Sequence, residues 1–336
     1  MNLNEQIQLK LDSLTKPKDS LGDLEKIALK LGMIQQTDKP VIKQKGTIVF
    51  AADHGVVKHK VSAFPKEVTV QMVLNFLNNG AAINVLSNFV NSKVFVVDSG
   101  VDYDFDEKCG VIKNKIMKGT GDIYLDKAMS LEQAKKNVEL GKNLVLKLVS
   151  EHNLDLITLG EMGIGNTTPA TAIIGIICGL DSDKITGRGT GINNESLRIK
   201  EKIISSVIKK LSGQNDPFII LSETGGLEIA QMAGAIIACY EKKIPVVIDG
   251  LICTGAALIS YLINNKTPDY MFAGHKSFEP GHIFALKKLG LKPILDLDMR
   301  LGEGTGAVLA MNIIEASTRI INEMATFDTA GVSKKI

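Results

Sequence analysis

Short apolar runs alternate with longer amphipathic stretches along most of the chain. The first run covers residues 47–52, and Asp53-His54-Gly55 follows it directly. Each run suits a short strand that is buried on both faces, and several end in an acidic or a glycine residue. The runs that we interpret as strands are residues 47–52, 93–97, 154–159, 244–248, 270–272 and 292–295.

Between these runs, apolar residues recur at the three- and four-residue spacing of an amphipathic helix. In the N-terminal stretch, Ser20 is the expected N-cap, with Asp23 three positions later and an apolar stripe from Leu21 to Leu31. Residues 219–221 fit a strand or a helix equally well. The helices expected after the first strand are residues 68–77, 81–89, 131–149, 168–178, 196–211, 227–240, 251–263, 282–289 and 307–324.

Alternation of strand and helix is typical of a parallel α/β sheet. We expect one large α/β domain over residues 46–306. The helices in residues 1–45 and 307–336 fall outside the alternation, and we expect them to pack together as a small, discontinuous helical domain. Ligands bind at the carboxyl ends of the strands in such sheets, so the polar and glycine residues there are the first candidates for a site.

The composition argues against several classes of protein. A net charge of +2, without a dense stripe of Lys or Arg, gives no reason to expect a nucleic acid or a membrane as partner. No apolar run approaches the length of a membrane span, and the first residues lack the pattern of a secretory signal. The four cysteines are far apart, without metal-ligand spacing. We therefore expect a cytoplasmic protein that binds no metal.

Four glycine-rich loops interrupt the pattern, at residues 119–122, 160–168, 187–191 and 302–306. Glycines let backbone N–H groups approach a phosphate closely, and a helix that starts after the loop adds a partial positive charge. The second and fourth loops run from a strand region into a helix. Any one loop is equally well explained as a tight turn, and none matches GxGxxG or GxxxxGK[ST]. Together the four loops favour a phosphorylated ligand.

Two of these loops carry a glutamate, Glu161 and Glu303, between small residues at a strand–helix junction. A carboxyl group that is partly shielded from water has a raised pKa and works better as a general base near neutral pH. For a single glutamate, an exposed loop residue or a helix N-terminal acid is the commoner explanation. Both residues are therefore candidates for catalysis, no more.

Other polar residues at the strand ends are weaker candidates. His275 and His282 are seven positions apart, which is not the spacing of a metal-binding pair on one helix. The segment from Asp249 to Thr254-Gly255 is similar to the ribose-binding loop of phosphoribosyl-pyrophosphate transferases. That loop carries two adjacent acidic residues, and Gly250 stands here at the second of these positions. Lys200 is placed to reach a phosphate, although a solvated surface lysine is the default explanation.

Taken together, these segments resemble the nicotinate-nucleotide–dimethylbenzimidazole phosphoribosyltransferase family. The resemblance runs nearly from end to end, and several blocks in the same order are far more specific than glycine loops alone. The matching blocks are residues 16–22, 52–56, 65–72, 160–168, 187–191, 274–277 and 300–306.

The resemblance implies a doubly wound, mostly parallel sheet with helices on both faces, a small domain built from both chain ends, and a homodimer. It also implies a reaction. The ribosyl 5′-phosphate of nicotinate mononucleotide passes to 5,6-dimethylbenzimidazole, which gives α-ribazole 5′-phosphate and nicotinate with inversion of the anomeric carbon. Because the leaving group is already a pyridinium cation, we expect the enzyme to need no metal and no cofactor.

By the same resemblance, Glu303 is the proton acceptor, and Glu161 is a secondary candidate near the ribose or the nucleophile. The residues that match the benzimidazole pocket are Ser62, Phe64, Pro65, Gln71 and Leu301. The residues assigned to the nucleotide and its phosphate are Gly163, Lys200, Asp249, Gly250 and Ser277.

Phe64 stands where some members of the family have a larger or hydroxylated aromatic residue. Relatives also accept purines and phenolics, so dimethylbenzimidazole is the default acceptor. Two other classes remain open, a dinucleotide-binding oxidoreductase and a non-enzymatic nucleotide-binding protein. The oxidoreductase needs a fuller GxGxxG motif than this chain has, and a binding protein would keep its ligand after Glu303 is removed.

Overall fold

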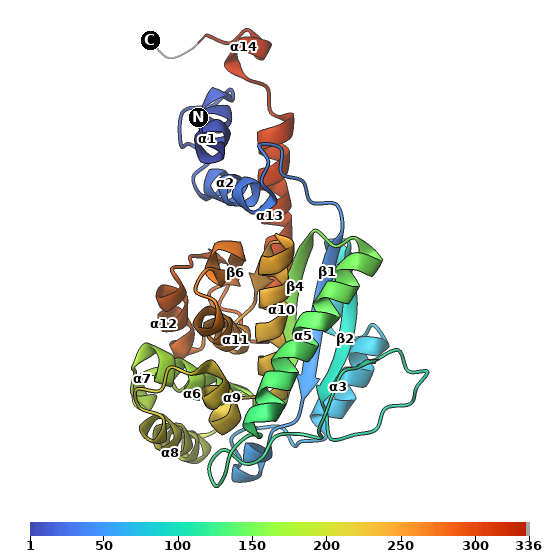
Figure 1. The fold of residues 1–336 in the computed structure, drawn as a ribbon, viewed down its shortest axis with the longest axis vertical. Coiled ribbons are helices and arrows are strands. Elements are labelled where there is room, and N and C mark those ends of the chain that lie inside the picture. Colours follow the sequence, from blue (N-terminus) through green and yellow to red (C-terminus); the bar gives the residue numbers. More distant parts are fainter. Residues whose placement is uncertain (334–336) are drawn as a thin grey trace.

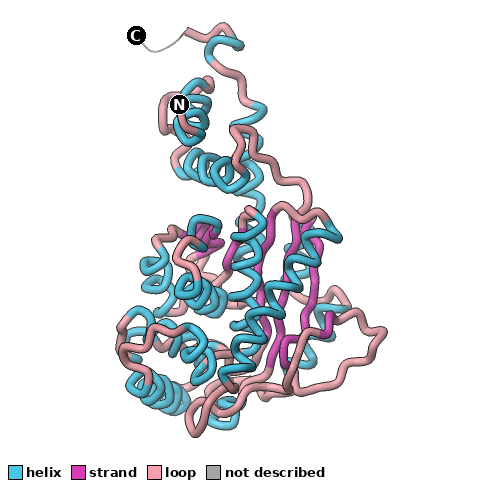
Figure 2. Tube along the Cα trace, viewed as in Figure 1, coloured by secondary structure: helices cyan, strands magenta, loops and turns pink. Residues whose placement is uncertain are grey.

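A parallel β-sheet between two layers of helices forms the body of the molecule (Figures 1 and 2). The computed structural model describes residues 1–333. In these residues the sheet has seven strands in the order β3-β2-β1-β4-β5-β6-β7. The strands are β1 (Lys45–Ala52), β2 (Ser92–Gly100), β3 (Ile112–Lys113), β4 (Leu156–Met162), β5 (Val246–Ile248), β6 (Met271–His275) and β7 (Pro293–Leu295).

The order of the strands makes this a doubly wound sheet, as expected. The chain runs outward from β1 to β2 and β3, and then returns to the other side of β1 for β4 to β7. The direction of winding therefore reverses between β1 and β4. The carboxyl ends of the strands at such a reversal bound the crevice in which ligands bind.

Strand β1 shows why the apolar runs form strands at the centre of the molecule. All eight of its residues are buried. Ile48 and Phe50 belong to the apolar core on one face of the sheet, whereas Val49 and Ala51 belong to the core on the other face. Successive side chains point to opposite faces, so a strand that is covered on both sides must be apolar throughout.

Different sets of helices cover the two faces. The first core receives side chains from α5 (Leu131–His152), α6 (Thr167–Cys178), α8 (Asn194–Lys210), α9 (Pro217–Thr224), α10 (Leu227–Lys242), α11 (Leu251–Ile263) and α12 (Pro280–Leu289). The second core receives them from α2 (Asp23–Gln35), α3 (Val68–Leu77), α4 (Ala82–Phe89) and α13 (Thr305–Glu323). The short elements are η1 (Gly55–His59), α7 (Ser182–Ile185), η2 (Thr267–Tyr270) and α14 (Phe327–Ala330).

The two ends of the chain meet beyond one end of the sheet, where α1 (Leu3–Ser13) and α2 lie beside the C-terminal half of α13 (Figure 1). Leu14 and Thr326 form an isolated antiparallel bridge there. A third apolar cluster holds these helices together and consists of Ile7, Leu11, Leu14, Ala28 and Ile321. Helix α13 starts at Thr305, on the sheet, and so crosses the proposed domain boundary. The division into two domains stays a prediction.

The expected N-cap of α2 is wrong. The helix begins at Asp23, after Gly22 with its left-handed φ of 55°, and Ser20 lies in the preceding turn. This turn is held from within the helix, because Glu25 accepts a hydrogen bond from Leu21 N and pairs with Lys16 at 2.8 Å in a buried site.

Two further elements were left open or missed in the sequence, α9 and β3. Residues 219–221, which fitted a strand or a helix, lie in α9, where Asp216 accepts hydrogen bonds from Phe218 N and Ile219 N and Pro217 occupies the first turn. Strand β3 was not predicted, since its two residues are too few to show a period. Among residues 1–333, no helix combines the length and the apolar character needed to cross a membrane.

Candidate active site

A cleft of about 630 Å³ opens beside the carboxyl ends of β4, β5 and β6. This volume is in the range of small-molecule binding sites. The glycine-rich loops at 160–168 and 302–306 contribute to its walls, together with segment 187–191 and the loop before α3. The lining residues that had been singled out in the sequence are Ser62, Phe64, Glu161, Gly163, Asp249, Gly250, His275, Ser277, Leu301 and Glu303.

Three other expected residues lie off this lining. Pro65 and Gln71 are exposed, close to the wall that Phe64 and Met72 form. Lys200 is fully buried behind Thr167 and segment 187–191, so the alternative of a solvated surface lysine is wrong. Its Nζ donates hydrogen bonds to Thr167 Oγ1 at 2.8 Å and to the Gly187 carbonyl at 3.1 Å. Burial lowers the pKa of Lys200 to about 8.

Glu161 lies near the end of β4, and its side chain is buried. The side-chain amide of Asn166 donates a hydrogen bond to Glu161 Oε2. Burial raises the pKa of Glu161 to about 8, and the neighbouring acids Asp249, Glu228 and Glu303 act in the same direction. Glu161 is therefore mostly protonated at neutral pH.

Glu303 lies in a loop where three consecutive residues are left-handed, with φ of 87° at Gly302, 62° at Glu303 and 94° at Gly304. Such a conformation is uncommon for a residue with a side chain. The backbone N–H of Ile83 donates to Glu303 Oε2 at 3.2 Å. Burial raises the pKa of Glu303, and the nearby Asp249 adds to the effect. The loop thus presents to the cleft a carboxyl group that holds a proton more readily than a solvated one.

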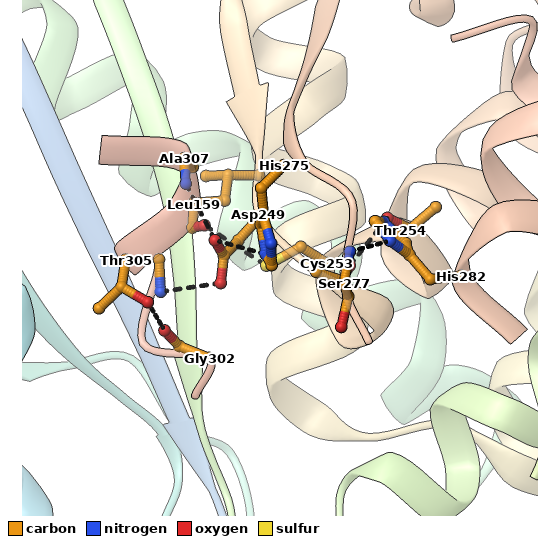
Figure 3. A network of polar contacts seen from close by, with 12 residues as sticks. Leu159, Asp249, Cys253, Thr254, His275, Ser277, His282, Gly302, Thr305 and Ala307 are labelled. Atoms are coloured by element: carbon orange, nitrogen blue, oxygen red, sulfur yellow. Dashed lines mark hydrogen bonds and ion pairs between the residues drawn. The ribbon is translucent and has the colours of Figure 1, made fainter. Parts of the chain in front are cut away.

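Asp249 and His275 lie side by side at the ends of neighbouring strands (Figure 3). The Asp249 carboxylate accepts hydrogen bonds from Ala307 N at 2.9 Å and from Gly304 N at 3.3 Å. His275 Nε2 is 3.4 Å from Asp249 Oδ1. Both side chains are almost completely buried.

His282 connects two loops of the cleft through a fixed, neutral ring (Figure 3). Ser277 N donates to His282 Nδ1 at 2.9 Å. The Thr254 hydroxyl donates to the Gly250 carbonyl at 2.8 Å, so its oxygen accepts from His282 Nε2, 2.9 Å away. Burial, with a contribution from His275, lowers the pKa of His282 to about 3. The uncharged imidazole therefore fixes Ser277 relative to the start of α11 over the whole physiological pH range.

Two polar residues of the cleft were missed in the sequence. Thr190 Oγ1 accepts a hydrogen bond from Ala63 N at 2.8 Å and lies 3.2 Å from Ser62 Oγ, which joins segment 187–191 to the loop before α3. Glu279 Oε1 accepts from Gly189 N at 2.9 Å. Thr190 lies inside a glycine loop that had been recognised, so its hydroxyl was open to prediction. Nothing in the local sequence distinguishes Glu279 from an ordinary residue before a helix.

Acidic side chains outnumber basic ones in the cleft, although Glu161 among them is mostly protonated at neutral pH. Among the lining residues, all of which the structure describes, the acidic side chains outnumber the single guanidinium of Arg300 and are those of Glu161, Asp249, Glu279 and Glu303. Such a cleft suits a ligand with a cationic centre and a reaction in which a carboxylate takes up a proton.

Acidic groups close enough to share a metal ion occur, among residues 1–333, at Asp12, Asp19 and Glu25. These residues lie in and around the terminal helices and not in the cleft. A reaction without a metal stays a prediction.

Known proteins match the chain along nearly its whole length. A family model described as "Phosphoribosyltransferase" matches residues 1–332. Two proteins named nicotinate-nucleotide–dimethylbenzimidazole phosphoribosyltransferase are close in sequence. The one from Desulforamulus reducens is 50% identical over 98% of this chain and 94% of its own length. The one from Geobacter sulfurreducens is 46% identical over 99% of this chain and 94% of its own length.

The fold matches as closely as the sequence. A crystal structure described as CobT from Thermus thermophilus superposes with a TM-score of 0.96 and 42% sequence identity, and the match covers 99% of both chains.

Proposed function

This chain belongs to the nicotinate-nucleotide–dimethylbenzimidazole phosphoribosyltransferase family, and from this premise we propose which of its residues carry out the reaction. The family resemblance seen in the sequence is thus confirmed. The enzyme transfers the ribosyl 5′-phosphate of nicotinate mononucleotide to 5,6-dimethylbenzimidazole and releases nicotinate and α-ribazole 5′-phosphate.

The nucleotide lies across the ends of β4, β5 and β6 in this proposal. Gly163 precedes α6, whose N-terminus offers backbone N–H groups and a partial positive charge to a phosphate. Ser277 and Gly250 border the same part of the cleft. Lys200 acts from behind the wall, where it holds Thr167 and adds positive charge without being exposed to solvent.

The acidic cleft suits the leaving group. Nicotinate in the mononucleotide carries the positive charge of a pyridinium ring, which nearby carboxylates favour. When the glycosidic C–N bond breaks, its electron pair returns to the ring nitrogen, and the ring leaves without that charge. The incoming nitrogen attacks the opposite face of the sugar carbon, which converts the β-anomer to the α-anomer.

Glu303 is the proton acceptor for the incoming base. It lines the cleft together with Leu301, Phe64 and Ser62. As one nitrogen of the benzimidazole attacks, the N–H on its other nitrogen becomes acidic, and the Glu303 carboxylate takes that proton. The observation that carries this proposal is the buried position of Glu303, because burial raises its pKa and so makes it a better base.

Glu161 has a different role in this scheme. With a pKa of about 8, it already holds a proton at neutral pH and is unable to accept another. We assign it to hydrogen bonding near the ribose, on the floor that it forms with Asn166.

A homodimer is part of the proposal. It rests on the family resemblance and on large apolar side chains that α4 exposes, with Val85 at 63% and Phe89 at 69% exposure. Sedimentation equilibrium should then give twice the chain mass of 36.2 kDa. A single-chain mass at micromolar concentration would contradict the dimer.

Purified protein should convert nicotinate mononucleotide and dimethylbenzimidazole to α-ribazole phosphate with a chelator present and no added Mg²⁺. Chromatography of the products, with a panel of benzimidazole, purine and phenolic acceptors, measures this and ranks the acceptors. If none of the acceptors gives a product, the proposed function is wrong. If product is lost only when the chelator is present, the reaction needs a metal ion.

Glu303→Gln keeps the size of the side chain but removes the base. We expect kcat to fall by roughly 10²- to 10⁴-fold, the usual contribution of general base catalysis, with little change in KM for the nucleotide. The matched control is Glu195→Gln, at an exposed position in the first turn of α8, and it should leave kcat unchanged. Wild-type kcat in Glu303→Gln would show that another group takes the proton.

A further inference from the structure

The loop that carries Glu303 leads directly into α13, and that helix start lacks a cap from its own sequence. The N-cap residue is Gly304, which has no side chain. The first N–H groups of any α-helix have no partner within the helix. The Thr305 hydroxyl does not supply one, because it donates to the Gly302 carbonyl at 2.8 Å.

The side chain of Asp249, from another part of the chain, supplies the missing hydrogen-bond acceptors. It follows β5, and its two carboxylate oxygens accept from Gly304 N at 3.3 Å and from Ala307 N at 2.9 Å (Figure 3). A carboxylate in this position also benefits from the partial positive charge of the helix N-terminus. The first turn of α13 is therefore tied to the end of β5.

The next strand holds this arrangement in place. His275, at the end of β6, approaches Asp249 Oδ1 to 3.4 Å through Nε2. Its ring packs so closely on the helix that a Cβ on Gly306 would lie 2.1 Å from His275 Cδ2. Burial raises the pKa of Asp249, whereas His275 and the N–H groups of the helix start oppose that rise.

These contacts lead to a different role for Asp249 from the nucleotide contact expected from the sequence. We propose that Asp249 is a positioning residue, which caps α13 with the support of His275 and thereby sets where the Glu303 carboxylate points. Asp249 borders the cleft, but its side chain is only 1% exposed and each of its oxygens accepts a backbone hydrogen bond from the start of α13, so the helix is its main partner. This inference rests on the role of Glu303 proposed above.

The test is a double-mutant cycle on the full-length enzyme. Asp249→Asn replaces one acceptor oxygen by an N–H donor, and we expect a decrease in kcat of tenfold or more, with less than a threefold change in KM for nicotinate mononucleotide. If Asp249 acts through Glu303, the variant with both Asp249→Asn and Glu303→Gln should be no more than twofold slower than Glu303→Gln alone. The matched control is Asp216→Asn, which weakens a carboxylate cap on α9 and should leave kcat unchanged.

Two results would overturn the inference. One is a large rise in the KM for nicotinate mononucleotide, and the other is a double variant whose loss equals the product of the two single losses. Either result would mean that Asp249 contacts the nucleotide or acts independently of Glu303. If Asp249→Asn does not fold, His275→Gln provides the same cycle, with a smaller loss of kcat that must also disappear in the Glu303→Gln background. Full activity of the single variant Glu303→Gln would instead disprove the proposed role of Glu303 as the proton acceptor.

Discussion

Glu161 is a buried residue whose carboxyl group retains its proton at neutral pH. Its pKa is about 8 in the folded protein, against 4.5 for the unperturbed group. Between these two values the folded state binds a proton that the unfolded state has lost. Stability from this residue is therefore complete below about pH 4.5 and is lost as the pH rises through about 8.

Glu161→Gln should therefore stabilise the protein, and more so in alkaline solution. Glutamine keeps the shape of the protonated acid but never ionises, so the gain over wild type should grow between pH 5 and pH 8.5. One pKa unit corresponds to about 1.4 kcal/mol, so a gain of about 2 kcal/mol or more at pH 8.5 is expected. Urea unfolding at the two pH values measures it. An equal difference at both would show that the pKa of Glu161 is not raised.

At the scale of single elements, the loop that carries Glu303 packs directly against β4, and this contact leaves no room for a side chain at Gly160. A Cβ on Gly160 would lie 2.0 Å from the Glu303 carbonyl oxygen, which is backbone and unable to turn aside. Gly160→Ala should therefore displace the loop and reduce kcat by at least tenfold. Steady-state kinetics with both substrates, together with a circular dichroism spectrum to verify folding, measures the effect.

A glycine in a helix provides the control for this prediction. Gly255, in α11, has no neighbour closer than 3.6 Å to an added Cβ, at Ala170. Gly255→Ala should keep kcat and raise the stability slightly, because alanine favours the helix by about 1 kcal/mol. Equal losses of kcat in the two variants would mean that the damage is not specific to the Glu303 loop.

Most elements could be predicted from the sequence because their apolar period is long and regular. The helix at 251–263 was placed at the residues where α11 lies, and that at 68–77 where α3 lies. The N-cap of α2 was not predictable, since a buried ion pair between Lys16 and Glu25 decides where that helix begins. Two-residue β3 was equally out of reach.

The residues of the site likewise include some that could be predicted from the sequence and others that could not. Loops in which glycine and glutamate are adjacent drew attention to Glu161 and Glu303, and both line the cleft. Contacts between distant segments leave no local trace. Glu279 contacts segment 187–191, and Asp249, at the end of β5, caps α13; only the folded chain shows either contact.

At the scale of the whole molecule, α13 joins the cleft to the meeting point of the two chain ends. It begins at the Glu303 loop, and Ile321 near its end packs in the third cluster with Leu11 of α1. Side chains of α2 also belong to the core on the sheet, alongside those of α13. We therefore expect the terminal helices and the sheet to unfold together.

Leu11→Ala tests this expectation. Leu11 is fully buried, and such a truncation typically costs about 2–5 kcal/mol. Calorimetry should show one transition at a lower temperature than in the wild type. Two transitions, of which only the earlier one shifts, would instead establish the terminal helices as an independent domain.

The side chains that face the acceptor contribute little to the fold. Phe64 is 52% exposed and Leu301 is 60% exposed, whereas Glu303 is held by buried backbone contacts. Substitutions at exposed positions usually change stability by less than about 0.5 kcal/mol. In evolution, lineages that descend from one such enzyme are thus free to adopt different acceptor bases by changing these two positions, while inheriting the proton acceptor unchanged.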